Sequence, residues 1–438
     1  MKLSFPDIPF PVKHLPIFYG WPLIIFATVG LAITAPSQTI GLAVFTENFI
    51  TSFGLTRIQL SMSYMIGTIA GVFFIAPIGS LYDRYGIRII AMASALMLGA
   101  VMCFFVFIPQ LLPSLRSLFP GLPVALLSGI VVTGGYLGMS IFGQGALVVV
   151  SRNMVMKWFD KRRGLANGIL GTLSSCIYSL TPMILNYVHN HRSWQEIFLF
   201  MAKVTGIVFT LFVFIFFRDN PQQCGLLPDG KPIAVDTGKP PSLPAQAYTL
   251  SQALGSYVFW IFSLSLFMNA LIANAIFFHI EDIFEHAGKS KEMGFNMFFP
   301  GWIISIAILF TGSWLSDFIK LKYILIVNLM GMIIFSMGVY FLPYHTYSYY
   351  TLITGYGIVS GTFNILVIVP FPRFFGLSHL GAITGFSLAM IITGNAMGPY
   401  ILSLLSNNGR GYGSFSMLSL VVLLLLILCS TKAEKNHS

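Results

Sequence analysis

The 438-residue chain is 56% hydrophobic and only 9% charged, with a mean hydropathy of +0.82. Soluble domains carry about 25% charged residues, so the composition excludes an ordinary soluble protein and predicts a membrane protein. The net charge of +10 comes from 24 scattered Lys and Arg residues, which form no basic stripe of the kind that follows a nucleic acid backbone. The positive-inside rule of membrane proteins explains this charge better, and we expect no nucleic acid partner.

Two further features restrict the kind of protein. Residues 1–20 are interrupted by prolines and lack the apolar core and cleavage site of a signal peptide, so we expect a retained cytoplasmic tail. The four cysteines lie far apart in the sequence and none stands in a CxxC spacing. The sequence therefore predicts no disulfide framework, no metal site and no cofactor.

Twelve apolar runs are each long enough to cross a bilayer as a helix, which needs about 20 apolar residues. We place them at residues 21–45, 58–80, 88–109, 122–151, 164–188, 195–217, 254–280, 292–315, 322–343, 349–371, 380–405 and 413–430. The fourth run is long enough to tilt or to extend beyond the bilayer. The predicted fold class is an all-α membrane protein with 12 transmembrane helices.

The longest gap between runs divides the chain into two halves. Residues 218–253 are rich in Pro, Gly and charged residues, which is typical of a linker. We therefore predict a cytoplasmic tail at 1–20, a six-helix half at 21–217, a cytoplasmic linker at 218–253, a second half at 254–430 and a cytoplasmic tail at 431–438. Most Lys and Arg residues fall on one side of the membrane if both termini are cytoplasmic.

The two halves share an internal register. An offset of 217 residues takes Gly164 to Gly381, Gly168 to Gly385 and Pro182 to Pro399, in the fifth and eleventh runs. Close helix packing explains each glycine singly, because small residues allow helices to approach. The shared spacing instead favours two related halves. A charged turn, GSLYDRYGIR at 79–88, also has a counterpart in GSWLSDFIKLK at 312–322.

These motifs resemble the major facilitator superfamily. The turn at 79–88 matches the superfamily's signature loop at Gly79, Leu81, Asp83, Arg84, Gly86 and Arg88. Further stretches are similar to the oxalate/formate antiporter and monocarboxylate transporter branch: FYGWPL, FGLTRIQLS, KWFDKRRGLANGI, FFHI and FFGLSHLGAITG. The resemblance covers nearly the whole chain.

The resemblance implies a function and a mechanism. It implies a monomeric secondary transporter, not an enzyme, in a bacterial-type inner membrane, with two halves related by a pseudo-two-fold axis that rock around a midplane site. The implied substrate is a small organic anion, moved by proton symport or anion exchange. The eighth and eleventh runs carry no charge, however. A dicarboxylate without a buried cation would be costly to desolvate, so oxalate is doubtful and a monocarboxylate is the expected substrate.

The charged turns are candidates for a conformational latch. Asp83 can accept hydrogen bonds from the backbone at the start of the third run, or pair with Arg152 at the end of the fourth. The alternative is that these charges only set the topology, to which acidic residues contribute little. The predicted latch residues are Gly79, Asp83, Arg84, Gly86, Arg88, Arg152 and Asp317.

Polar residues within the apolar runs are candidates for contact with the small-molecule substrate. They are Gln38, Thr39, Gln144, Asn269, Asn274, Asn364 and Asn395. In the superfamily that the motifs resemble, spans 1, 4, 7 and 10 line the central cavity. The alternative is that these amides join helices to one another within the bilayer. Tyr136, Tyr178, Tyr356 and Trp302 are further candidates, although large aromatic residues often serve packing alone.

Two ionisable residues lie within or near the apolar runs. Lys203 is a cation within the sixth run, for which we favour snorkelling or contact with lipid. His279, near the outer end of the seventh run, is the candidate for proton coupling, because histidine changes charge near physiological pH.

Two other functions stay open. The uncharged, aromatic-rich runs would also suit an exporter of an amphipathic, drug-like or siderophore-like molecule. The stretch HIEDIFEH places His279, Asp282 and His286 on one helix face, where they could hold a divalent metal in a membrane receptor or metal-binding protein that does not transport. The substrate, the coupling ion and the direction of transport do not follow from the sequence.

Overall fold

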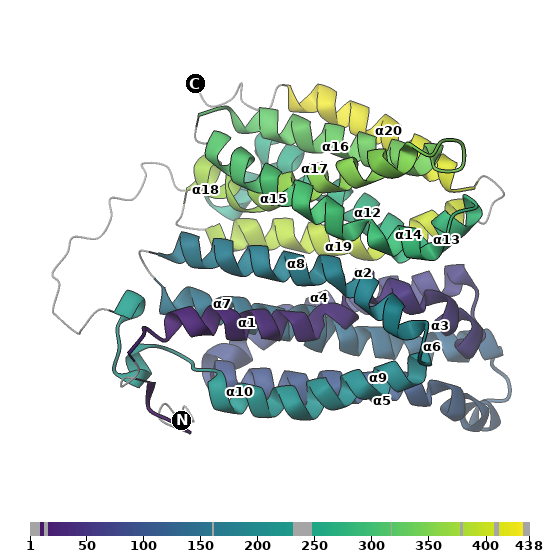
Figure 1. Ribbon diagram of the computed structural model, residues 1–438, viewed down its shortest axis with the longest axis horizontal. Helices are drawn as coiled ribbons and strands as arrows, with labels where there is room; N and C mark the ends of the chain where they lie inside the picture. The colour runs from purple at the N-terminus through teal and green to yellow at the C-terminus, as the bar shows by residue number, and fades with distance from the viewer. Residues whose placement is uncertain are drawn as a thin grey trace. The chain divides into compact units, whose positions relative to one another are not determined.

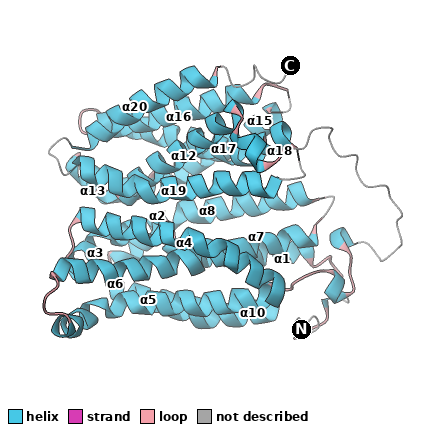
Figure 2. Cartoon of the chain, turned by 180° about the vertical axis from the view of Figure 1, so that it is seen from behind, coloured by secondary structure: helices cyan, strands magenta, loops and turns pink. Residues whose placement is uncertain are grey.

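The computed structural model describes residues 9–12, 16–159, 162–230, 248–316, 318–376, 380–406 and 411–431. Within these ranges the chain forms helices joined by loops and contains no strand (Figure 2). The chain divides into two compact units, Met1–Gly238 and Lys239–Ser438. This division falls inside residues 218–253, the segment predicted as a linker.

In the first unit, the long helices lie side by side (Figure 1). The α-helices are α1 (Gly20–Thr34), α2 (Thr39–Leu42), α3 (Thr46–Phe53), α4 (Arg57–Tyr85), α5 (Ile87–Leu118), α6 (Val124–Gly138), α7 (Val148–Trp158), α8 (Arg163–His189), α9 (Trp194–Lys203) and α10 (Thr210–Phe216). Two π-helices, η4 (Met139–Leu147) and η5 (Val204–Phe209), continue α6 and α9 without a break in the helix axis. Short 3-10 helices are η2 (Ala35–Ser37), η3 (Ala43–Phe45), η6 (Gln222–Cys224) and η7 (Pro228–Gly230).

The second unit is built in the same way from long helices with short connections. Its helices are α11 (Leu250–Leu254), α12 (Tyr257–Phe278), α13 (Ile280–His286), α14 (Lys291–Asn296), α15 (Phe298–Leu315), α16 (Leu321–Phe341), α17 (Ser348–Ile368), α18 (Pro370–Phe375), α19 (Leu380–Leu405) and α20 (Gly411–Ser430). Each long helix corresponds to one predicted apolar run.

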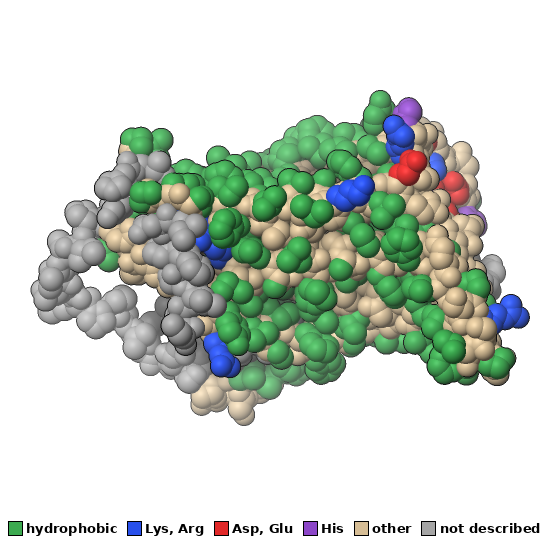
Figure 3. All heavy atoms as spheres, turned by 90° about the horizontal axis from the view of Figure 1, so that it is seen from below, with side chains coloured by type: hydrophobic (Ala, Val, Ile, Leu, Met, Phe, Trp, Pro, Cys, Tyr) green, Lys and Arg blue, Asp and Glu red, His purple; other side chains and the backbone are tan. Residues whose placement is uncertain are grey.

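Eleven helical stretches among the described residues are long and apolar enough to cross a membrane. The remaining predicted run, at residues 58–80, corresponds to α4, which is not among the eleven but has 29 residues, a length of about 43 Å at 1.5 Å per residue. One face of the molecule is covered along most of its length by hydrophobic side chains (Figure 3). The protein is therefore a multi-pass membrane protein.

The helices of the second unit approach closely where glycines face a neighbour. A Cβ atom at Gly398 of α19 would collide with the backbone carbonyl of Leu271 in α12, and one at Gly394 would lie 2.5 Å from the carbonyl oxygen of Phe267. Glycines four residues apart lie on one helix face, so they let the two backbones come together. By contrast, a Cβ at Gly385 of the same helix would meet no atom within 4 Å.

Part of the predicted linker packs onto the first unit. The Arg218 side chain is 2% exposed; it donates to the Phe217 and Ile215 carbonyls at 2.9 and 2.8 Å and to the Phe10 carbonyl at 3.3 Å. Tyr19 donates to the Phe216 carbonyl at 2.7 Å, and burial raises the pKa of its hydroxyl to about 12, so it stays a donor at neutral pH. The described part of the N-terminal tail is therefore held against the end of α10.

We expect Gly398→Ala to lower the melting temperature of the purified protein. The new methyl group would force α12 and α19 apart, and overpacking of this kind costs about 1–3 kcal/mol. Gly385→Ala is the matched control, because the same methyl group enters open space on the same helix. Equal melting temperatures for the two variants would show that the glycine contact does not hold the helices together.

Candidate functional site

The first predicted span is broken near its middle. Helix α1 ends at Thr34, the 3-10 helix η2 follows, and Gln38 is extended, with φ −78° and ψ 158°, before the short helix α2 begins. Pro36 stands in η2 and has no backbone N–H, so it cannot continue the α-helical hydrogen bonding. Backbone carbonyls and polar side chains are thereby presented in the middle of a membrane span.

Three neighbouring helices supply polar groups to this break. Gln144 of η4 donates its side-chain amide to the Ser37 carbonyl at 2.7 Å. The Thr39 hydroxyl shares a 2.7 Å hydrogen bond with the hydroxyl of Tyr64 in α4. The Thr34 hydroxyl lies 3.2 Å from the hydroxyl of Tyr178 in α8. We call these residues, with Gln38, the span-1 site.

The π-helix η4 places Gln144 against the break. A π-helix widens the turn, and such segments occur often at functional sites. Beside Gln144, a Cβ atom at Gly143 would overlap the side chain of Ser37. The absence of that atom lets the fourth span lie directly against the broken backbone, within hydrogen-bond reach of Ser37.

Tyr136 adds a buried hydroxyl near the same site. Its side chain is 2% exposed, and its ring meets that of Tyr64 edge to face with centroids 5.3 Å apart. Within the described parts of the chain, its hydroxyl has no hydrogen-bond partner. A buried hydroxyl without a partner costs free energy, so this group marks a place that a polar ligand or water would stabilise.

In the second unit, Asn274 and Asn395 come together. The Asn274 amide of α12 donates to the Asn395 side-chain oxygen of α19 and to the Ala270 carbonyl at 3.0 Å. Both residues are half-buried. Two predicted substrate-contact residues thus form one polar pair between two neighbouring helices, in the C-terminal half of each.

Asn269 belongs to a different, fully buried network. Its amide donates to Asn328 of α16 at 3.3 Å, and Asn328 donates to Thr362 of α17 at 2.8 Å. The side chain of Asn328 is 0% exposed. This arrangement is the interhelical bonding that the sequence left as the alternative for Asn269. The sequence analysis overlooked Asn328, although a lone asparagine in the apolar run LKYILIVNLMGM was a usable signal.

The remaining candidates in the second unit stand apart from these pairs. Asn364 is exposed and donates to the Ser360 carbonyl of its own helix at 3.0 Å. Tyr356 packs its ring against Gly301 and edge-on to Phe277, at a centroid distance of 5.5 Å. Trp302 stacks on Phe299 of the preceding turn, at 5.7 Å. Tyr356 therefore serves packing in this conformation.

His279 lies at the junction of α12 and α13 and is fully buried. Its Nε2 atom is 2.9 Å from the carbonyl oxygen of Pro399 in α19. A carbonyl oxygen can only accept, so Nε2 carries the hydrogen. His279 therefore ties the end of the seventh span to the eleventh, next to the proline of the internal repeat.

At the predicted cytoplasmic end, Asp219 holds the start of α5. Its carboxylate accepts from the backbone N–H of Arg88 at 2.9 Å, where the helix dipole favours a negative charge. Gly86 has φ 92°, a conformation suited to glycine, and a Cβ atom there would lie 2.5 Å from the Asp219 carboxylate. The sequence assigned this acceptor role to Asp83 and did not consider Asp219.

The other latch candidates are placed only in part. Asp317 lies outside the described residues, as do the side chain of Asp83 and the surroundings of Gly79. Arg84 stacks over the Tyr85 ring at 5.3 Å, and Arg152 is exposed on α7. In the second unit, Arg373 donates to the Ser316 carbonyl at 2.9 Å, next to the related turn. The latch itself remains a prediction.

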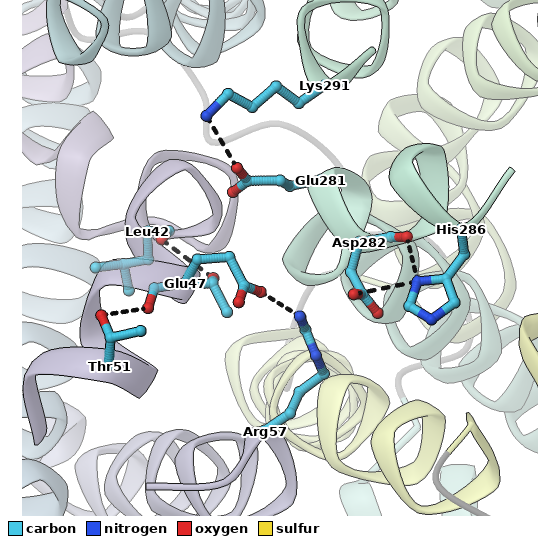
Figure 4. A network of polar contacts seen from close by, with 9 residues as sticks. Leu42, Glu47, Thr51, Arg57, Glu281, Asp282, His286 and Lys291 are labelled. Atoms are coloured by element: carbon cyan, nitrogen blue, oxygen red, sulfur yellow. Dashed lines mark hydrogen bonds and ion pairs between the residues drawn. The ribbon is translucent and has the colours of Figure 1, made fainter. Parts of the chain in front are cut away.

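Ion pairs lie at helix ends that the sequence analysis predicted to face the outside (Figure 4). In the first unit Glu47 pairs with Arg57, and in the second Glu281 pairs with Lys291 at 3.2 Å. His286 lies 3.3 Å from the Asp282 carboxylate. No group of three His, Cys, Asp or Glu residues in the described ranges could hold a metal ion. HIEDIFEH thus forms local ion pairs.

Comparison with known proteins identifies the fold. The model of the Major Facilitator Superfamily matches residues 23–376. The chain is similar, at 14% identity and a TM-score of 0.63, to a bacterial homologue of the human lysosomal transporter Spinster in an inward-facing and occupied conformation, covering 96% of this chain and 97% of that one. The unoccupied form of that homologue gives the same identity and TM-score over 95% and 96%. No curated protein sequence matches.

Substitutions at Asp219 and Asp83 should separate a structural from a conformational role. We expect Asp219→Ala to lower the melting temperature, because loss of a helix cap costs about 0.5–2 kcal/mol.

Asp83→Asn should leave the melting temperature unchanged and slow transport in proteoliposomes if Asp83 is part of a latch. Transport at the wild-type rate by Asp83→Asn would reject the latch.

Proposed function

Because the chain belongs to the Major Facilitator Superfamily, we propose that it is a secondary active transporter of a small monocarboxylate, driven by proton symport or anion exchange. Members of this superfamily are transporters rather than enzymes. The observation that supports the proposed substrate class is the neutral polar lining of the span-1 site. Hydroxyl and amide groups from four helices converge there.

Gln38 is the group best placed to meet a substrate. It stands at the extended residue of the break and is half-buried, and its side chain forms no hydrogen bond to any described residue, although its backbone does. Each oxygen of one carboxylate can accept from hydroxyl and amide donors of this kind. A second carboxylate would need further compensation, since a bare buried charge is expensive. The site therefore favours one negative charge over two.

The distribution of cations also supports a substrate with one negative charge. Away from the helix ends, the described parts of the spans contain one cation, Lys203, and its side chain is exposed. The proposed substrate must therefore be held by neutral donors, or enter together with a proton. Both requirements fit a monocarboxylate better than oxalate. Membership of the oxalate/formate antiporter and monocarboxylate transporter branch, which the sequence motifs implied, is part of this proposal.

An exporter of an amphipathic molecule is the second candidate. The uncharged site and the nearby rings of Tyr64 and Tyr136 would suit an apolar molecule with few hydrogen-bonding groups. Resistance to toxic compounds in cells that express the chain, with no accumulation of monocarboxylates in proteoliposomes, would favour this candidate.

We propose the following location and orientation. The chain is a monomer in an inner membrane, and both termini are cytoplasmic. The bias of Lys and Arg toward the tails, the linker and the loops on one side supports this orientation.

Gln38→Ala tests the substrate site. Loss of one hydrogen bond to the substrate is worth about 1–1.5 kcal/mol, so we expect KM to rise about fivefold to tenfold. The melting temperature should not change, because the Gln38 side chain bonds to no described residue and the backbone bonds of Gln38 are kept in the variant. Uptake of labelled formate, lactate and pyruvate, with oxalate as the dicarboxylate comparison, provides the measurement.

Gln110→Ala is the matched control, since this amide is exposed on α5. It should leave KM unaltered. An unchanged KM in Gln38→Ala, or a preference of the wild-type protein for oxalate, would contradict the proposal.

His279→Gln tests proton coupling. Glutamine can still donate to the Pro399 carbonyl but does not titrate, so we expect a normal melting temperature and a flatter dependence of uptake on pH between about 5 and 8. His279→Ala should in addition lower the melting temperature, because the buried hydrogen bond is lost, at about 1–3 kcal/mol. A wild-type pH profile in the glutamine variant would assign His279 a structural role alone.

A further inference from the structure

Lys203 is exposed in the middle of a membrane span. It is the last residue of α9, within the helical span Trp194–Phe216. At 1.5 Å per residue it lies about 13 Å from Trp194 and about 20 Å from Phe216 along the helix axis. Both distances place its Cα atom inside a hydrocarbon core about 30 Å thick.

The surface around Lys203 is apolar. The exposed side chains on the same helix face are Phe200, at 67%, Ile207, at 60%, and Leu211, at 58%. They stand three residues before, four after and eight after the lysine, which is the spacing of one helix face. Lys203 therefore faces lipid and not a polar interior.

The backbone holds Lys203 in this direction. A Cβ atom at Gly99 of α5 would lie 2.8 Å from the Ala202 carbonyl oxygen and 2.8 Å from the Gly206 Cα atom, so the two helices meet closely beside Lys203. The π-helix η5 begins at Val204, directly after the lysine. π-helical turns are uncommon and occur often at functional sites. In this packing the Lys203 side chain is exposed.

The ammonium group has no protein partner in the described ranges: no hydrogen bond, ion pair or aromatic contact is formed by Lys203. A lysine at the centre of a span costs about 2.5–3.5 kcal/mol on insertion scales. The Cα–Cβ bond of a helical residue points toward the helix N-terminus, here toward Trp194 and the predicted outer surface. The lysine stem, about 6 Å long, brings the ammonium toward the headgroups of that leaflet.

We propose that Lys203 is a binding site for the phosphodiester of an anionic phospholipid. The ammonium pairs with the lipid phosphate, and the acyl chains lie along the apolar face formed by Phe200, Ile207 and Leu211. The ligand is a lipid and not a free phosphate, because the surface that surrounds the charge is hydrocarbon-facing. This site is independent of the transport substrate.

Competition between lipids tests this site. The full-length protein in neutral detergent is mixed with dioleoylphosphatidylglycerol and dioleoylphosphatidylcholine, and the lipids that stay bound are counted by native mass spectrometry. We expect a preference for phosphatidylglycerol that falls about fivefold in Lys203→Gln, since one basic residue near the surface contributes about that factor. Lys203→Arg should keep the preference.

Arg116→Gln is the matched control, because it removes an exposed basic residue at the end of α5 in the same unit. The Arg116→Gln variant should keep the wild-type preference for phosphatidylglycerol over phosphatidylcholine. An undiminished preference in Lys203→Gln overturns the proposal, as does an equal loss in Arg116→Gln. Soluble glycerophosphate that displaces phosphatidylglycerol as well as the lipid itself does would also overturn the proposal, because that result identifies a site for a free anion. Melting temperatures of all variants without lipid show that the proteins are folded.

Discussion

The interaction on which the rest of the first unit depends is the hydrogen bond between Gln144 and the Ser37 carbonyl. A membrane span can leave the helical conformation only where other protein groups satisfy its backbone. Pro36 and the extended Gln38 open the first span, and Gln144 closes one of the resulting gaps at 2.7 Å. The π-helix in the fourth span and the missing side chain at Gly143 both follow from the need to bring that amide to the break. The hydrogen bonds that satisfy the broken helix thus gather polar groups within a membrane span.

In the second unit, side-chain amides bond between helices instead of satisfying a broken backbone. In its described residues no span has an extended residue like Gln38 between two helices in mid-membrane, and the amides of Asn269 and Asn274 bond across helices. The Asn269–Asn328–Thr362 chain is fully buried and fixes three helices, whereas Asn274 and Asn395 are half-buried and form a separate pair. A buried amide with satisfied partners rigidifies a bundle, while one with exposed atoms remains available to a ligand. Burial, not residue type, separates these two roles.

The sequence predicted the fold well because hydrophobic length is a strong signal. Every predicted run became a helix, and the interruption at Gln38 and Thr39 was visible as APSQT. The sequence could not tell Asn269 from Asn274, since both stand in the same apolar run and their roles depend on what α16 and α19 present to them. It also missed Tyr64 and Asp219, whose partners lie 25 and 131 residues away. Long-range pairing of this kind leaves no local pattern.

Charged residues are confined mainly to the helix ends. Aspartates, glutamates and most basic residues of the described chain stand at helix ends, where water, the helix dipole or an opposite charge compensates them. Lys203 is exposed, and α5 packs closely beside it against Ala202 and Gly206. If the proposed substrate enters at the span-1 site, it meets the neutral hydroxyl and amide donors described there. The proposal of a substrate with one charge, or with a charge cancelled by a proton, rests on this scarcity of charge.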